Sequence, residues 1–304
     1  MAEKRTAQIA AHKFAWDGLA FEVPDDWHLS LYHFGMKMKE SSVEMEDDEA
    51  LRLQMEWLRP KVPVSEEHAQ NRYMTACTKW QELADNSTLL SDLAPGWTAL
   101  VYTMPSKRRL VAAWWIAPDR KFVLLLKLHF DDVGHRHPEK VMRHLADTFS
   151  LHAEGRIPWA CYDMSFALQP HFRLVATGFQ AGCKLMVFQW RLRKLYMWQV
   201  SLADIALKGR QPNCWAAEFL NAYKPIKGVV FSAGDKGTID GSRGGPYRCG
   251  HYDEIGRMCF RYHVGCRHDP ETNSLRLMLF NYRHELDLRE LENALDPAWL
   301  KNVA

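Results

Sequence analysis

The sequence predicts an α+β protein made of two tandem copies of one unit. Each copy is predicted to be an antiparallel-sheet sandwich with flanking helices in the order β-β-α-β-β-α, and the copies to be related by pseudo-twofold symmetry. Length indicates two domains, because 304 residues exceed the usual size of one hydrophobic core. The composition, 47% hydrophobic and 25% charged, is typical of globular chains. The third observation is an internal repeat, in which residues 16–29 align with residues 159–174.

The repeat opens each copy with an apolar-alternating strand, then proline, then an aromatic residue. Leu19, Phe21 and Val23 lie two residues apart, so their side chains share one face of a strand. This strand ends at Pro24, because proline has no N–H to donate to a neighbouring strand. Apolar residues match between the copies: Phe21 with Phe166, Val23 with Leu168 and Trp27 with Phe172.

Three more strands are predicted in each copy, where apolar and polar residues alternate. They are residues 50–58, 109–116 and 121–130 in the first copy, and residues 184–192, 257–264 and 274–282 in the second. The first strand of each set carries a tryptophan at an equivalent place, Trp57 and Trp190. Each set therefore predicts one antiparallel sheet.

Two helices are predicted in each copy: residues 65–84 and 138–149 in the first, and residues 213–223 and 288–295 in the second. Ser65 is the expected N-cap of the first helix, with acidic residues in the turn that follows. Gly155 and Pro158 interrupt the chain between the closing helix and the next strand. We therefore expect the domains to be residues 1–155 and 156–304.

The opening pattern resembles the PsbP/DcrB-like α/β sandwich, present here as two tandem copies. Residues 18–27, GLAFEVPDDW, carry the resemblance, whereas the second copy departs from it with QPHF at residues 169–172. The resemblance implies the fold, and a role as a binding, chaperone-like or assembly protein. It carries no catalytic residue to this chain.

Charge and cysteine content narrow the classes of partner. Thirty-nine basic against 37 acidic residues leave a net charge of +2, too small for a field that gathers nucleic acid. The most apolar run, residues 122–130, is interrupted by Lys127 and is too short to span a membrane. The first residues do not have the pattern of a secretion signal, so we do not expect export. Seven cysteines without a CxxC pair favour reduced thiols. We expect a soluble cytoplasmic protein with no membrane contact.

Metal-ligating residue types gather in one segment of the second copy. They are Cys249, His251, Cys259, His263, Cys266 and His268. Such a set could hold zinc and serve a metal-dependent enzyme, although the paired spacing of structural zinc sites is absent. Period-two alternation places Cys259 and His263 on one strand face. No nucleotide-binding or hydrolase motif emerges elsewhere, so we expect no cofactor, and a binding protein rather than an enzyme.

A second alternative is a nucleic-acid-associated module. Residues 191–198 combine Arg191, Arg193 and Lys194 with aromatic residues, and Lys208 and Arg210 follow. Alternation along a strand would turn Arg193 and Lys194 to opposite faces, which argues against a continuous basic stripe. Residues 234–245 are rich in glycine without a phosphate-loop spacing, so we expect a hairpin loop there, with Arg243 as a recognition residue.

The preferred hypothesis is a non-catalytic adaptor or assembly factor that binds another protein. Twelve tryptophans are present, and aromatic side chains beyond the needs of the core are common at interfaces. The neighbours Trp114 and Trp115 must point to opposite faces of a strand, so we expect one of them to meet a helix or a partner. The acidic residues 40–49 are predicted to form a solvated loop.

Overall fold

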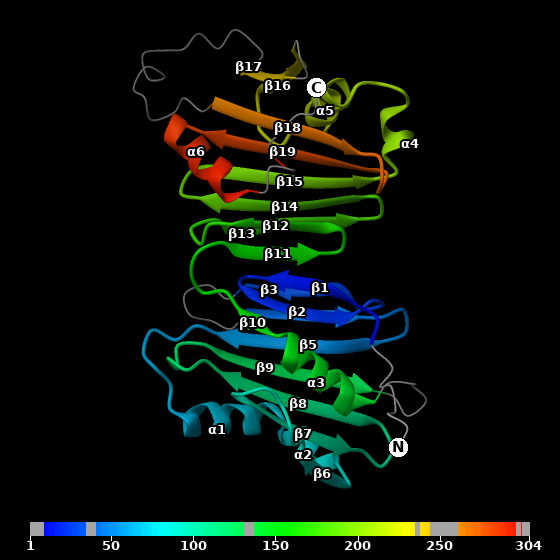
Figure 1. The fold of residues 1–304 in the computed structure, drawn as a ribbon, viewed down its shortest axis with the longest axis vertical. Helices are drawn as coiled ribbons and strands as arrows, with labels where there is room; N and C mark the ends of the chain where they lie inside the picture. The colour runs from blue at the N-terminus through cyan, green and yellow to red at the C-terminus, as the bar shows by residue number, and fades with distance from the viewer. Residues whose placement is uncertain are drawn as a thin grey trace, which may run out of the picture. The chain divides into compact units, whose positions relative to one another are not determined.

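The computed structural model describes residues 9–34, 41–130, 137–234, 238–243, 261–295 and 299. The chain divides into two compact units (Figure 1). Unit 1 comprises residues 1–151 with 160–162, and unit 2 comprises residues 152–159 with 163–304. Both units are α+β and are dominated by antiparallel sheets.

Unit 1 is built on a seven-stranded antiparallel sheet of order β3-β4-β5-β9-β8-β7-β6. A hairpin of β1 and β2 belongs to a separate sheet, in which β10 pairs with β2. The elements are β1 (Ala11–Trp16), β2 (Leu19–Pro24), β3 (His28–His33), β4 (Ser41–Glu46), β5 (Leu51–Leu58), α1 (Glu66–Ala76), α2 (Thr78–Leu83), β6 (Asn86–Leu89), β7 (Trp97–Thr103), β8 (Arg109–Ile116), β9 (Val123–Phe130), α3 (Pro138–Thr148) and β10 (Ser150–Leu151).

Unit 2 is built on a five-stranded antiparallel sheet of order β13-β14-β15-β19-β18. A hairpin of β16 and β17 lies beside β18, where Gly241 faces the ring of Tyr262. The elements after β10 are β11 (Ile157–Cys161), β12 (Met164–Leu168), β13 (Arg173–Gln180), β14 (Cys183–Trp190), β15 (Arg193–Ser201), α4 (Ala203–Leu207), α5 (Pro212–Tyr223), β16 (Val229–Ala233), β17 (Ile239–Arg243), β18 (Arg261–Asp269), β19 (Ser274–Tyr282) and α6 (Glu285–Ala294). The last two residues of β11, Ala160 and Cys161, fall within unit 1.

The opening strand of unit 1 has the faces that its alternation predicts. Leu19, Phe21 and Val23 are buried in β2, whereas Glu22 between them is exposed. The strand ends at Pro24, and Trp27 just beyond it is fully buried. The predicted strands at residues 109–116 and 274–282 coincide with β8 and β19.

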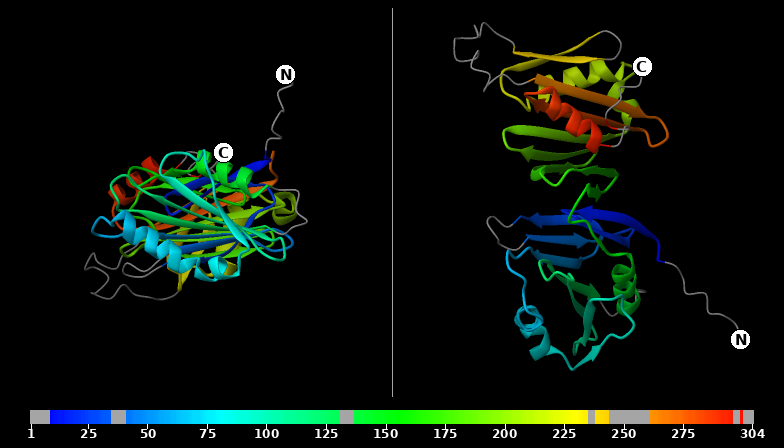
Figure 2. Two further views of the ribbon diagram at one scale, coloured as in Figure 1. Left: turned by 90° about the horizontal axis from the view of Figure 1, so that it is seen from below. Right: turned by 60° about the vertical axis from the view of Figure 1, so that its left-hand side comes forward.

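The seven-stranded sheet of unit 1 has helices on both faces, and the two further views of Figure 2 show α1 and α3 on opposite sides of it. The helical segment of α1 and α2 packs on one face of this sheet. The buried residues at this contact are Tyr73 and Cys77 from the helical segment and Leu110, Ala112 and Leu125 from the sheet. In unit 2, α5 packs Trp215 on one face of the sheet. The helix α6 lies against β19 and β12.

Three predictions about local structure are wrong. The predicted order β-β-α-β-β-α is too short, because in the described residues five strands, two helices, four strands and one helix follow one another, first up to α3 and again from β11 to α6. Within the range predicted as a loop, residues 41–46 instead form β4, in which Val43 and Met45 are buried. The intervening glutamates lie on the more polar face of the sheet and hide the alternation. The predicted helix at residues 65–84 is two helices, since Cys77 leaves the helical conformation between them. Ser65 is the N-cap as predicted, and its hydroxyl accepts from His68 N at 3.1 Å.

Candidate recognition groove

Trp114 and Trp115 lie on opposite faces of β8, as strand alternation requires. The ring of Trp114 lies under α1, with its centroid 4.0 Å from that of Tyr73. The ring of Trp115 lies on the other face, 4.9 Å from the ring of Phe149 just beyond α3. Both indoles are half-buried. The two tryptophans therefore lie on opposite sides of the sheet, and Trp115 lines a surface hollow of unit 1.

The hollow beside Trp115 is an open apolar cavity of about 570 Å³, which we name the tryptophan groove. Its apolar lining comes from the loop before β7, from β7 and β8, and from the segment that ends α3. The lining residues used below are Pro95, Trp97, Trp115, Pro118, Phe149 and Leu151. Trp97 and Trp115 both meet Phe149 edge to face, with interplanar angles of 80° and 71°. Such edge-on contacts are favourable between aromatic rings, so the lining is preorganised.

The position of Trp115 depends on the backbone of the loop before β7. Its indole N–H donates to the carbonyl of Pro95 at 3.3 Å. Gly96 follows with φ +85°, and a Cβ built on it would lie 2.8 Å from Nε1 of Trp115. Only glycine combines this left-handed conformation with so close an approach. Gly96 therefore leaves room for the indole that lines the groove.

Two carboxylates are the charged side chains of the groove lining. Asp119 lies in the turn between β8 and β9, where it accepts from Lys121 N at 3.0 Å. Asp147 lies in the last turn of α3. Both side chains are exposed, and neither forms an ion pair within the described part of the chain. The groove is thus apolar with an acidic rim.

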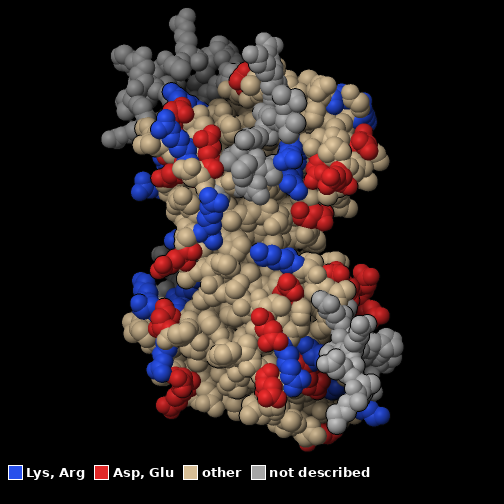
Figure 3. All heavy atoms as spheres, viewed as in Figure 1, with Lys and Arg blue, Asp and Glu red and all other residues tan. Residues whose placement is uncertain are grey.

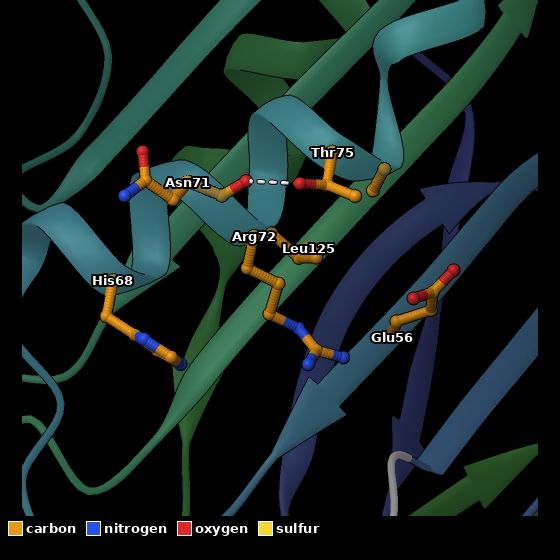
Figure 4. A pocket seen from close by; sticks show the side chains of 7 residues that line it. Glu56, His68, Asn71, Arg72, Thr75 and Leu125 are labelled. Atoms are coloured by element: carbon orange, nitrogen blue, oxygen red, sulfur yellow. Dashed lines mark hydrogen bonds between the residues drawn. The ribbon is translucent and has the colours of Figure 1, made fainter.

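The second hollow of unit 1, which we name the α1 cleft, is polar and has a volume of about 490 Å³. Figure 4 shows His68, Asn71 and Arg72 extending from α1, with Glu56 on the neighbouring strand. These helical positions are three to four residues apart, so they share one face. The cleft presents charges of both signs, because Arg72 and Glu56 both line it.

The α1 cleft lacks the arrangement of an activated nucleophile at Thr75. The Thr75 hydroxyl donates to the carbonyl of Asn71 at 2.9 Å, a bond within the helix (Figure 4). Its proton is therefore committed to the main chain and not to a general base, which nucleophilic catalysis requires. Glu56 is paired with Lys127 at 3.5 Å.

A buried polar layer holds the helical segment on the sheet next to this cleft. The Tyr73 hydroxyl donates to the carbonyl of Ala112 at 3.2 Å. Burial and the neighbouring Tyr102 hydroxyl raise the pKa of Tyr73, and burial raises the pKa of Cys77 to about 11. Both groups stay protonated at neutral pH, so they act as structural hydrogen-bonding groups.

The basic residues predicted to contact nucleic acid do not form one surface. Arg191 lies in the turn between β14 and β15 with φ +55°. Arg193 is mostly buried, with its Nε 2.7 Å from Oδ2 of Asp287 and its guanidinium 4.6 Å from the ring of Trp190. Lys194 is exposed on the other strand face. On the face drawn in Figure 3, basic and acidic side chains are interspersed.

Two further basic residues of that hypothesis, and Arg243, are placed as follows. Lys208 is the C-cap of α4, with φ +50°. Arg210 is ion-paired with Glu218. Arg243 is the last residue of β17, at a position whose side chain lies outside the described residues.

The predicted metal cluster is described in part. Cys249, His251 and Cys259 lie outside the described residues. His263, Cys266 and His268 lie in β18, where alternation turns His263 to one face and the other two to the opposite face. Burial raises the pKa of the Cys266 thiol to about 12, which opposes the thiolate that zinc requires. Within the described residues no group of three His, Cys, Asp or Glu side chains is placed to hold a metal.

Sequence reasoning singled out Trp115 but not the groove around it. The other lining residues come from three separate segments, and only the folded sheet brings them together. The available signal was local: residues 94–97 read Ala-Pro-Gly-Trp, a turn sequence ending in an aromatic residue just before a strand.

Comparison with known proteins finds one kind of similarity. No protein-family model matches the chain, and no curated protein matches it. Among solved structures, the chain is similar to cyanobacterial PsbP (CyanoP) from Synechocystis sp. PCC 6803, a member of the family that the sequence resembles. The two are 13% identical, the match covers 50% of this chain and 99% of that chain, and the TM-score is 0.32. In the described residues no helix is long and apolar enough to cross a membrane.

Proposed function

We propose that the chain is a non-catalytic protein-binding module, an adaptor or assembly factor that acts in the cytoplasm as a subunit of a complex. The observation that carries the proposal is the tryptophan groove. It presents the half-buried rings of Trp115 and Phe149, which neighbouring groups hold in place, and aromatic side chains are enriched at protein interfaces. Its size is in the range of ordinary ligand sites.

We also infer that the two units are copies of one fold. Within the described residues, five strands, two helices, four strands and one helix follow one another in unit 1 before β10, and again from β11 onward. The sequence alignment of Leu29 with Leu174 gives a sharper point of comparison. The register of β3 on β4 shifts between Leu29 and Leu31, and that of β13 on β14 shifts between Leu174 and Ala176. A bulge at the same aligned place supports common descent, because bulges are retained within families.

A tagged pull-down from the native cell at low and moderate salt tests the binding proposal. Trp115→Ala should lose a stoichiometric protein partner, because it removes one wall of the groove. Trp114→Ala is the matched control, since it removes an adjacent, half-buried indole on the other face of the same strand. If both variants retain the partner, the proposal is contradicted. Zinc recovered in the same eluate without a protein partner would move the function to the cysteine and histidine segment of unit 2.

A further inference from the structure

We propose that the tryptophan groove takes an extended segment of its partner protein in which a bulky apolar side chain is flanked by basic side chains. This inference rests on the proposed function and names the chemistry of the partner. Three independent features of the groove carry it: the shape of its apolar lining, the sign of its charges and the strand edge beside it.

The apolar lining suits one bulky side chain. Phe149 meets the rings of Trp97 and Trp115 edge on, at centroid distances of 5.3 and 4.9 Å. Pro95 and Pro118 add rigid, apolar walls. A large aliphatic or aromatic side chain placed here would bury apolar area against surfaces that are already ordered. Little conformational entropy would then be lost on the side of the groove.

The charges of the lining select basic neighbours of that side chain. Among the described residues that line the groove, the charged ones are Asp119 and Asp147, and they come from separate elements. Asp147 lies in the last turn of α3, which holds no basic residue. The C-terminal end of a helix is the negative end of its dipole, so an aspartate there is unfavourably placed in the free protein. A lysine or arginine of the partner would neutralise both the carboxylate and the helix end.

The extended conformation follows from β10. Ser150 and Leu151 line the groove and form a strand at the end of the row β10-β2-β1. Main-chain groups at a sheet edge commonly bind a partner segment as an additional strand. Side chains of such a segment alternate, which lets an apolar residue enter the groove while its neighbours remain near the rim.

The full-length chain can be tested with three fluorescein-labelled peptides, GKLWLKG, GELWLEG and GKAAAKG, by fluorescence anisotropy. At low salt we expect GKLWLKG to bind about tenfold more tightly than GELWLEG, since each exposed ion pair contributes modestly. The preference should shrink in about 0.5 M salt, because exposed charges are then screened. GKAAAKG should bind weakly, because it leaves the aromatic lining empty.

Two sets of variants locate the effect. Asp119→Asn combined with Asp147→Asn should lower the affinity for GKLWLKG about fivefold and leave that for GELWLEG equal or higher. Asp204→Asn combined with Glu271→Gln removes the same charge from exposed positions of unit 2 and should change neither affinity. Asp119→Lys combined with Asp147→Lys should reverse the preference.

The outcomes separate the inference from the proposed function. Two results would overturn the charge selection: equal binding of GELWLEG and GKLWLKG, or no effect of the Asp119 and Asp147 variants. If GKAAAKG still binds weakly in either case, recognition of an apolar side chain by the groove is retained. If neither apolar peptide binds better than GKAAAKG, the groove does not recognise apolar segments, and the proposed function fails with the inference.

Discussion

Gly96 and Trp115 lie in direct contact, and a Cβ at position 96 would stand 2.8 Å from the indole nitrogen. Gly96→Ala would therefore face two costs, a left-handed backbone and a steric overlap with a ring that is held by Pro95. We expect the free energy of unfolding to fall by about 2–3 kcal/mol, and the indole N–H resonance of Trp115 to shift in NMR spectra.

Gly182→Ala is the control for this prediction. Gly182 also has a positive φ, +78°, but no atom lies within 4 Å of the added Cβ. Only the backbone cost of about 1 kcal/mol should appear in urea unfolding. Equal losses for the two variants would show that Trp115 does not press on Gly96.

The ion pair between Arg193 and Asp287 fastens α6 to the sheet of unit 2. Both side chains are mostly buried, and Asp287 also accepts from the main-chain nitrogens of Arg283 and His284, each at 3.1 Å. Asp287→Asn would leave a buried guanidinium without its counter-charge. We expect a loss of about 3 kcal/mol in denaturant unfolding.

Glu285→Gln provides the comparison within the same helix. Glu285 pairs with Arg261, but both side chains are more than half exposed. The loss should be below about 1 kcal/mol. A cost for Asp287→Asn no larger than this would mean that the buried pair does not hold α6 in place.

Stability should decline with falling pH in two stages. Burial lowers the pKa of His171 and of His263, with Glu290 and Glu292 respectively opposing the shift. The unfolded chain then takes up protons first, so unfolding free energy is lost as the pH falls below 6.5, the ordinary pKa of histidine. Hydrogen bonds from Arg193 and from the main chain lower the pKa of Asp287, and this contribution is lost only below its unfolded value near 3.8.

Urea unfolding from pH 8 to pH 3 checks this order. His263→Leu should flatten the decline between about pH 6.5 and pH 5, because it removes a half-buried imidazole that resists protonation. His68→Gln, at an exposed position on α1, should leave that part of the profile unchanged. A profile that is flat down to pH 5 in the unmodified protein would contradict the prediction.

The buried thiols should be unreactive in the folded chain. Burial raises the pKa of Cys77 to about 11 and of Cys266 to about 12, so almost no thiolate exists at pH 8. Iodoacetamide followed by peptide mass mapping should label exposed Cys214 first. Cys77 and Cys266 should be labelled only in denaturant. Rapid native labelling of Cys266 would show that β18 opens or that its thiol is activated.

Part of the fold could be predicted from alternation. Leu19, Phe21 and Val23 are buried as their spacing predicts, and β8 and β19 have the predicted bounds. The strand β4 was missed because its buried Val43 and Met45 alternate with glutamates on a face that is partly open to solvent. Polar residues on that face are compatible with a strand, yet along the sequence they resemble a charged loop.

The candidate sites depended far more on tertiary structure. Trp114 and Trp115 were recognised as facing opposite ways, because adjacent strand residues must do so. Which of them borders an apolar groove could not be inferred, since Pro95, Pro118 and Phe149 reach Trp115 from separate segments. Arg193 read as a surface cation, but Asp287, 94 positions later in the chain, pairs with it.

Local periodicity and capping act over a few residues, and they were enough to predict the α+β class, several strands and helices of each unit and the buried faces of those strands. Contacts between distant segments place Trp115 in a groove with acidic residues at its rim and pair Arg193 with Asp287. The strand β18 also turns His263 and Cys266 to opposite faces. The burial of a side chain, its ion pairs and the residues that line a groove depend on contacts between segments that are distant in the sequence. Local sequence patterns do not show which distant segments come into contact.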